Sequence, residues 1–424
     1  MRGNPPKYCG RAGRWLPLSC AKLLTRVCNS LIRFLVSALF VRTACKDPSD
    51  ILVLRSGAIG DFICCLPALS FLRQKFPHAR IHLLTTPTGN PRFWDRGYTP
   101  GALILTDSSL VDNTILFRGE DITALAQMLH LRQEITRLRP HLTYIIPQTG
   151  ETWRGILKKL FFLRFLGVTS NLHGYHLERP LPFFRRIDPA GAFDHQVIAA
   201  MKAVGASKGD HIRFPIPIPD SARERIDELW EESGLETGNF VIALFPGGKF
   251  EHKRWPVENF ARLCQSLAAE PTVSIVLVGG PQDKPITQRL VATCRAPLLD
   301  LSGKTSLRET AELLRRCNLY VGNDSGPAHI AAAVGIPCVT LFSSIHFPGI
   351  WEPWGAQNTA IRHPVPCEYC FSEDHCPVGT MACIRGIGVE EVLQVAELYL
   401  AKAASQQKYP SSPDESLVIR NHGT

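Results

Sequence analysis

Short, wholly apolar runs alternate with longer amphipathic segments along most of the chain from residue 51 onwards. The first apolar run, 51–55 (ILVLR), is followed by a glycine-containing turn, 56–61 (SGAIGD), and by a helical pattern over 62–77. A second apolar run, 80–86 (RIHLLTT), comes next. An apolar strand, a turn, a helix and another apolar strand predict a βαβ unit, whose two strands are parallel.

The same alternation continues towards the middle of the chain. We expect a helix over 121–138, and further strands at 102–106 (ALILT), 114–117 (TILF) and 142–148 (LTYIIPQ). A Pro-rich, extended stretch, RFPIPIPD, follows at 213–220 and predicts a linker between domains.

A second series of helices and strands begins after the linker, with a helix at 221–234. Each later apolar run ends in a turn rich in glycine or serine. These runs are FVIALFPGG (240–248), VSIVLVGG (273–280), PLLDLSG (297–303), LYVGNDSG (319–326) and PCVTLFSS (337–344). Two halves of this kind predict an α/β protein of two Rossmann-like domains. Their parallel sheets face a central cleft, and ligands bind at the carboxyl ends of the strands.

The pattern divides the chain into five segments. They are a basic amphipathic extension (1–47), an N-terminal Rossmann-like domain (48–213), a linker (214–220), a C-terminal Rossmann-like domain (221–404) and a disordered tail (405–424).

The N-terminal extension holds most of the net charge of +9. Residues 1–50 carry nine Lys or Arg and two Asp, a net +7, which leaves +2 for the remaining residues. Because the charge is confined to one tail, a nucleic-acid-binding face on the folded domains is disfavoured.

Residues 23–41 form an apolar run that Arg26 and Arg33 interrupt. These arginines argue against a transmembrane helix, and no clean cleavage site follows for a signal peptide. On a helical wheel, one face is apolar and another carries Arg and Ser. The apolar face comprises Leu24, Val27, Leu31, Phe34, Leu35 and Ala38. This pattern predicts a helix lying on an anionic membrane surface. The alternatives are a helix packed on the protein body and a flexible extension.

The first candidate for chemistry is the turn after strand 51–55. Gly57 and Gly60 allow a tight turn, and Asp61 then stands at the start of a helix, at the mouth of the predicted cleft. A carboxylate there can accept a proton from a hydroxyl. The alternative role for Asp61 is to cap the helix.

The second candidate is the loop FPGGKFEHKRWP at 245–256. Gly247 and Gly248 end a strand and can present backbone N–H groups, while Lys249, Lys253 and Arg254 add cations. A diphosphate leaving group needs this combination. A solvated basic loop is the alternative.

The third and most specific candidate is VGNDSGPAHIAAAVGIPCVTLF at 321–342. Asp324, Ser325 and Gly326 form a turn before a helix, whose free amides and dipole predict a pyrophosphate site. His329 lies one turn into that helix, with a structural hydrogen bond as its alternative role. In VGGPQDK (278–284), Asp283 is a candidate ribose contact, although a surface turn is the simpler interpretation.

These motifs, GAIGD, PGG with KRWP, GNDSGPAHIAAA and GIP in this order, resemble the heptosyltransferases of glycosyltransferase family 9. The resemblance runs from about residue 51 to residue 400. It implies a GT-B fold with an acceptor-binding N-terminal domain and a nucleotide-sugar-binding C-terminal domain.

The resemblance also implies an activity. It is inverting transfer of heptose from ADP-heptose to an inner-core lipopolysaccharide acceptor, at the cytoplasmic face of the inner membrane. Asp61 becomes the general base, Lys253 the phosphate contact, and 324–326 the diphosphate loop. No metal or other cofactor is expected in catalysis, since the loop and Lys253 take the place of a divalent ion.

Three other interpretations stay open. The first is the same fold with a different nucleotide sugar or glycan acceptor, and the second is a non-catalytic nucleotide-sugar or glycan binder. An NAD-dependent oxidoreductase is the third, disfavoured because the dinucleotide fingerprint is missing.

The acceptor side departs from the family pattern. A DLQG-like segment is replaced by TYIIPQTGETWRG, and the next helix, RGILKKLFFLRFLG, is unusually basic and aromatic. Arg154 and Lys158, together with Gly57 and Gly60, are our candidates for contacts with a phosphorylated, lipid-linked acceptor; solvated cations are the alternative.

Four of the fourteen cysteines form a cluster. Cys367, Cys370, Cys376 and Cys383 follow the pattern C-x2-C-x5-C-x6-C within the segment 367–383. Four thiolates suit a structural zinc ion; reduced thiols, a disulfide or iron–sulfur ligation are the alternatives. Cys64, Cys65, Cys264, Cys294, Cys317 and Cys338 are expected to be small core residues of a protein in a reducing compartment.

Overall fold

The computed structural model describes residues 18–43, 45–86, 100–117, 125–148, 151–169, 171–175, 194–207, 209–235, 238–372, 375–405 and 417–418. Among the helices of this part of the chain, none is long and apolar enough to cross a membrane.

The N-terminal domain is built on a five-stranded sheet in which all neighbouring strands are parallel, in the order β3-β2-β1-β4-β5. The strands are β1 (Asp50–Leu54), β2 (Arg80–Thr85), β3 (Asn113–Leu116), β4 (Leu142–Ile145) and β5 (Leu172–His173). Every residue of β1 is buried, as expected for a central strand covered on both faces. The predicted parallel βαβ unit is therefore confirmed.

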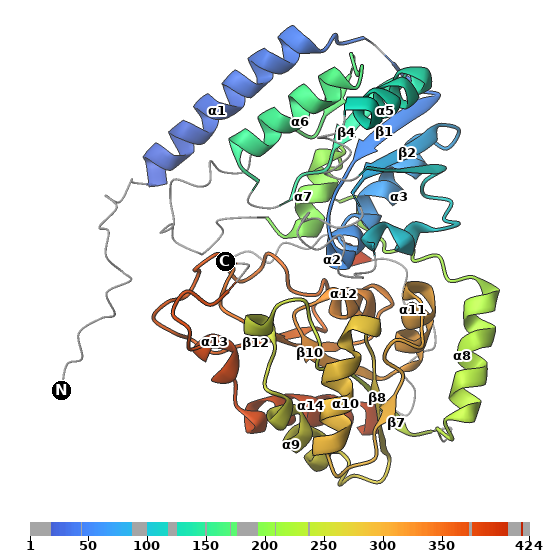
Figure 1. The fold of residues 1–424 in the computed structure, drawn as a ribbon, viewed down its shortest axis with the longest axis vertical. Coiled ribbons are helices and arrows are strands. Elements are labelled where there is room, and N and C mark those ends of the chain that lie inside the picture. Colours follow the sequence, from blue (N-terminus) through green and yellow to red (C-terminus); the bar gives the residue numbers. More distant parts are fainter. Residues whose placement is uncertain are drawn as a thin grey trace, which may run out of the picture.

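Helices cover both faces of this sheet (Figure 1). One face packs against α2 (Ile59–Ile63), α3 (Leu66–Lys75) and α7 (Gln196–Ala203). The other packs against α1 (Leu18–Leu39), α5 (Leu125–Leu138) and α6 (Trp153–Phe165).

One strand prediction in this domain is wrong. Residues Gly101–Leu105 form a 3-10 helix, η3, instead of a strand. A short apolar run fits a buried strand or a buried helical turn equally well, so length and periodicity do not distinguish them. The segment packs tightly beside α2, where a Cβ on Gly101 would lie 2.6 Å from the carbonyl oxygen of Ala58.

The C-terminal domain has a six-stranded parallel sheet in the order β12-β11-β10-β7-β8-β9. Its strands are β7 (Phe240–Phe245), β8 (Val273–Leu277), β9 (Leu299–Asp300), β10 (Leu319–Asn323), β11 (Cys338–Phe342) and β12 (Thr359–Arg362). One face is covered by α8 (Asp220–Glu232), α11 (Leu307–Arg316) and α12 (Gly326–Ala333). The other is covered by α9 (Val257–Leu267), α10 (Lys284–Thr293), α13 (Ala382–Arg385) and α14 (Val389–Ser405).

Two short elements lie outside the sheets of the two domains. β6 (His211–Ile212) pairs antiparallel with β13 (Leu417–Val418), which falls inside the segment predicted to be a disordered tail. The rest of that tail beyond Ser405, and residues 1–17 of the N-terminal extension, lie outside the described residues.

The two domains meet where α2 touches α12 (Figure 1). One continuous apolar cluster runs through this junction, from Phe62 in the N-terminal domain to Ala328 and Ile330 in the C-terminal domain. Two glycines allow the close approach. A Cβ on Gly60 would lie 2.7 Å from the His329 ring, and one on Gly326 would lie 2.8 Å from Cβ of Ile59.

This contact makes the domain junction sensitive to one methyl group. We expect Gly326→Ala to push α2 and α12 apart and to lower kcat/KM by about 100-fold, because catalytic groups misplaced by about 1 Å cost that much. Steady-state kinetics checks the expectation. Gly388→Ala is the matched control, since its Cβ would meet only ordinary contacts near 4 Å. Equal kinetics in the two variants would contradict it.

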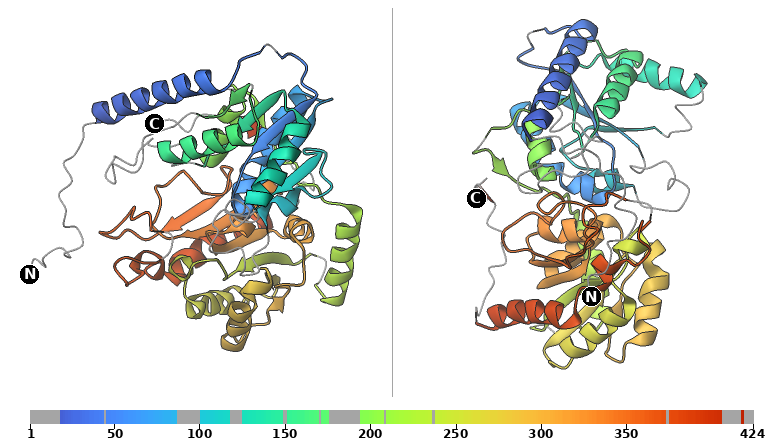
Figure 2. Two further views of the ribbon diagram at one scale, coloured as in Figure 1. Left: turned by 45° about the horizontal axis from the view of Figure 1, so that its top comes forward. Right: turned by 90° about the vertical axis from the view of Figure 1, so that its left-hand side faces the viewer.

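Helix α1 lies along α6 on the outer side of the N-terminal domain (Figures 1 and 2). It packs on the domain through the buried Ile32 and Val36, and Phe40, directly after the helix, is buried as well. The face predicted to be apolar is a different one, and on it Val27, Leu31 and Phe34 stay exposed. The packing on the protein body that was the alternative for this helix therefore occurs, and an apolar face stays exposed beside it.

Candidate functional site

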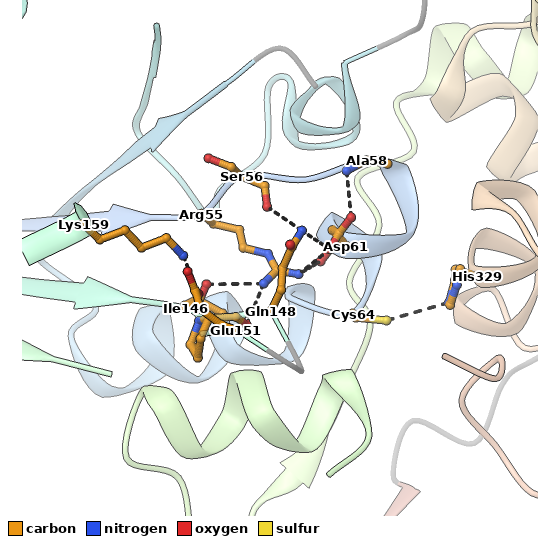
Figure 3. A network of polar contacts seen from close by, with 11 residues as sticks. Arg55, Ser56, Ala58, Asp61, Cys64, Ile146, Gln148, Glu151, Lys159 and His329 are labelled. Carbon is orange, nitrogen blue, oxygen red and sulfur yellow. Dashed lines mark hydrogen bonds and ion pairs between the residues drawn. The ribbon is translucent and has the colours of Figure 1, made fainter. Parts of the chain in front are cut away.

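Asp61 lies in the first turn of α2, immediately after the β1 turn, and its side chain is 12% exposed. Oδ2 accepts a hydrogen bond from the amide of Ala58 at 2.8 Å. Oδ1 accepts from Nη2 of Arg55 at 2.9 Å and from Nε2 of Gln148 at 2.8 Å (Figure 3). The carboxylate thus does help to cap its helix, and it is also held rigidly by three donors from three positions.

Arg55 and Gln148 are site residues that the sequence motifs did not reveal. The side chain of Arg55 is 2% exposed, and it also donates to the carbonyl of Pro147 at 2.8 Å. Arg55 directly follows β1, and Gln148 follows β4, the neighbouring strand. The sequence does show that both residues are polar and end apolar runs. This pattern indicates a shared site only when β1 and β4 are known to be adjacent strands.

Across the junction, Lys253 and Asp324 form the second half of the site. Nζ of Lys253 lies 3.5 Å from Oδ2 of Asp324, with the side chains 17% and 12% exposed. Asn323 fixes the loop that carries Lys253. Its Oδ1 accepts from the amide of Trp255 at 3.0 Å, and its Nδ2 donates to the carbonyls of Pro246 and Gly247 at 2.9 Å.

The glycine loop at 247–249 is held by Asp283. Its Oδ1 accepts from the amide of Gly248 at 3.2 Å, and its Oδ2 accepts from the amide of Gly280 at 2.9 Å. Burial raises the pKa of Asp283, and the two amides oppose that rise. Asp283 is therefore a buried anchor of two loops. Arg254 also stabilises the glycine loop, because its Nε donates a hydrogen bond to the carbonyl of Gly248 at 2.6 Å.

A cavity of about 160 Å³ opens between the domains at these loops. Ala58 and Ile59 line it from the N-terminal domain. The C-terminal domain contributes Gly248, Lys249, 279–283, 305–307, Thr310, Ser325, Gly326 and Pro327 among its lining. The cavity thus brings together four of the predicted donor-binding residues, and the amino end of α12 borders it. Backbone amides, a helix dipole and a lysine are suited to a diphosphate.

His329 is buried at the junction of the two halves. Its Nδ1 lies 3.7 Å from Sγ of Cys64, across the domain boundary (Figure 3). Burial lowers the pKa of His329, while the carboxylates of Asp324 and Asp61 oppose that effect and Lys253 adds to it. The imidazole therefore interacts electrostatically with both halves of the site.

Comparison with known proteins fits this arrangement. The family model described as glycosyltransferase family 9 (heptosyltransferase) matches residues 186–379. Over this segment, the chain is similar to glycosyltransferase family 9.

Several named relatives show the same similarity. Lipopolysaccharide heptosyltransferase 3 of Escherichia coli K12 is 24% identical over 316 residues, covering 70% of this chain and 82% of that protein. Lipooligosaccharide heptosyltransferase 2 of Haemophilus influenzae is 32% identical over 149 residues, 34% of this chain and 42% of that protein. The alignment with the Campylobacter jejuni heptosyltransferase 2 covers 51% of it, so the chain spans about half the length of several curated relatives.

Solved structures support the GT-B fold of two facing Rossmann-like domains. A glycosyltransferase family 9 protein from Veillonella parvula superposes with a TM-score of 0.64 at 19% identity, covering 85% of this chain and 99% of that one. The E. coli ADP-heptose lps heptosyltransferase II gives 0.59 at 19% identity, with coverages of 84% and 99%.

Arg154 and Lys158 do not join the Asp61 network. Both are exposed on α6, while Ile156 and Leu160 of the same helix are buried against the sheet. Lys159 lies nearer the site, with its Nζ 2.6 Å from Oε2 of Glu151 (Figure 3). Gly57 was also predicted to contact the acceptor. In the structure it packs against Asp61, because a Cβ added to Gly57 would lie 2.3 Å from the Cβ of Asp61.

The four clustered cysteines are free and half-buried. Burial raises the pKa of the Cys367 and Cys383 thiols, and the neighbouring thiols of the cluster raise it further. Within the part of the chain that is described, no three His, Cys, Asp or Glu residues converge as metal ligands. Zinc at these cysteines stays a prediction, which metal analysis of the purified protein checks. The six cysteines predicted to be core residues are buried and free.

Proposed function

We propose that the chain is an inverting glycosyltransferase that moves heptose from ADP-heptose to an inner-core-type lipopolysaccharide acceptor. The observation that carries this proposal is the meeting of α2, which holds Asp61, with α12, which begins just after Asp324, the partner of Lys253; a cavity lined in part by glycines opens between the domains there. The relatives are named for heptose transfer, and one E. coli heptosyltransferase was solved with ADP.

In the proposed reaction, Asp61 takes the proton of an acceptor sugar hydroxyl. The hydroxyl oxygen forms a bond to the anomeric carbon from the face opposite the leaving group, which gives inversion. The bond between that carbon and the diphosphate oxygen breaks, and ADP leaves with the electron pair. A carboxylate offers about four acceptor positions, and three of those on Asp61 are filled, so one stays available for the hydroxyl.

The departing diphosphate gains negative charge, and the C-terminal half of the site supplies the compensation. Nζ of Lys253 and the backbone amides around Ser325 and Gly326 stabilise this charge without requiring a divalent ion. Asp324 orients Lys253 in the resting protein through their 3.5 Å contact. Because the acceptor is lipid-linked, we place the reaction at the inner face of the cytoplasmic membrane.

The experiment that tests the function is ADP release from ADP-heptose, with and without a deep-core lipopolysaccharide acceptor. We expect release that depends on the acceptor and a product of inverted anomeric configuration by NMR. UDP-glucose, ADP-glucose and UDP-N-acetylglucosamine serve as matched donors. Transfer from one of these sugars but not from ADP-heptose would show that the proposed donor is wrong. Tight ADP binding without transfer from any donor would favour a non-catalytic binding protein.

A further inference from the structure

Exposed apolar side chains gather on one side of the N-terminal domain. The described part of the chain exposes twelve large apolar side chains, and eight of them lie on α1, α5 and α6 or directly after α1. Six that define this outer helical face are Val27, Leu31, Phe34, Leu129, Phe161 and Phe165. A gathering of this kind on a folded protein marks a surface that contacts something else.

The three helices present this face in the same direction. All three cover one side of the five-stranded sheet and bury their inner residues in a single apolar cluster. Residues on the opposite side of each helix therefore point away from the sheet. On α1, Val27 and Leu31 lie on the side opposite the buried Val36 by helical spacing, and the exposed Phe34 lies one turn from Leu31. Figures 1 and 2 show α1 and α6 side by side on this outer side.

The charge on these helices has nearly one sign. From Arg26 onwards they carry eight Lys or Arg, two on α1, two on α5 and four on α6, against one acidic residue, Glu134. On α1, Arg26 and Arg33 are exposed on another face than the apolar row, whereas on α6, Arg154 and Lys158 continue the row of Phe161 and Phe165. Apolar side chains bordered by cations are suited to a bilayer with anionic headgroups.

We propose that the outer helical face docks this chain on the surface of a phospholipid bilayer containing anionic lipid. Phe34, Leu31 and Phe161 enter the boundary between headgroups and acyl chains, and Arg154 and Lys158 contact lipid phosphates. A second copy of the chain is disfavoured as the occupant, because two such faces would bring cations against cations.

The face adjoins the acceptor side of the site. α6 begins at Trp153, shortly after Gln148, which donates to Asp61. Glu151, just before α6, pairs with Lys159 of that helix, and the pair lies beside that network (Figure 3). Docking would therefore hold the cleft near the headgroups, where the glycan of a lipid-linked acceptor lies. This last step rests on the proposed function, whereas bilayer binding itself does not.

Vesicle sedimentation with the full chain tests the proposal. We expect the protein to pellet with vesicles of phosphatidylethanolamine and phosphatidylglycerol, and to stay in solution with phosphatidylcholine alone. The double variant Leu31→Glu/Phe34→Glu removes two apolar contacts and adds two repelled charges, so its partition coefficient should fall by at least about 10-fold. Both residues are exposed, with Phe34 at 69%, so the fold should tolerate the change.

The matched control is Val291→Glu/Leu398→Glu, which places the same charges at exposed apolar positions on α10 and α14 of the other domain. It should bind vesicles as the unmodified protein does. Failure of the unmodified protein to pellet, or equal binding by both double variants, would overturn the proposal. So would a dimer in lipid-free sedimentation velocity that Leu31→Glu/Phe34→Glu converts to a monomer.

Activity separates this proposal from the proposed function. With a delipidated, soluble core oligosaccharide, Leu31→Glu/Phe34→Glu should release ADP at the unmodified rate, and with acceptor in vesicles its rate should fall about as much as its binding. Vesicle binding by the unmodified protein without ADP release from any acceptor would leave the docking surface standing and remove the proposed activity.

Discussion

Asp61→Asn is expected to lower kcat by about 10²–10⁴-fold, which is the range that a positioned general base contributes. The amide keeps the size of the carboxylate but cannot take the acceptor proton. ADP affinity should stay nearly unchanged, because the diphosphate-binding groups lie on the other domain. Turnover measured beside ADP binding by calorimetry checks both statements.

The substitution also leaves the guanidinium of Arg55 buried without its partner, which costs stability of about 3–5 kcal/mol in comparable cases. The double variant Arg55→Met/Asp61→Asn removes both charges and serves as the control for folding. We expect its melting temperature to recover towards that of the unmodified protein while its turnover stays low. Recovery of turnover together with stability would show that Asp61 has only a structural role.

Much of this site follows from sequence because its parts are local. The turn that carries Asp61 and the loop at 324–326 each join one strand to the next helix, so a short motif contains both the geometry and the chemistry. The parallel sheets follow equally directly, since apolar runs such as 240–245 are too apolar for a strand with a solvated face.

The parts that sequence did not supply depend on contacts distant along the chain. Gln148 reaches Asp61 from 87 residues away, and only the adjacency of β1 and β4 brings them together. The side-chain amide of Asn323 fixes the Lys253 loop through two carbonyls that lie 77 and 76 residues away along the chain. On α1, either of two apolar rows could pack against the N-terminal domain, and the composition of the helix does not show which row is buried.

Lys253→Met is expected to raise the KM for the donor and to lower kcat by about 10²–10³-fold, as removal of one group that stabilises a transition-state charge does. The loss has two sources. The cation facing the departing diphosphate disappears, and the carboxylate of Asp324, 3.5 Å from Nζ, is left to repel that diphosphate. Steady-state kinetics with varied ADP-heptose measures both constants.

The double variant Lys253→Met/Asp324→Asn separates the effect of the lost cation from the effect of the unpaired carboxylate. Removing the carboxylate takes away the repulsion, so the donor KM should recover in part, while kcat stays low because no cation stabilises the leaving group. Lys402→Met, which removes an equal charge from the exposed end of α14, is the control and should leave both constants unchanged. If Lys253→Met keeps the unmodified kcat, the positive charge at this position does not act on the leaving group, and the backbone amides at Ser325 and Gly326 carry that role alone.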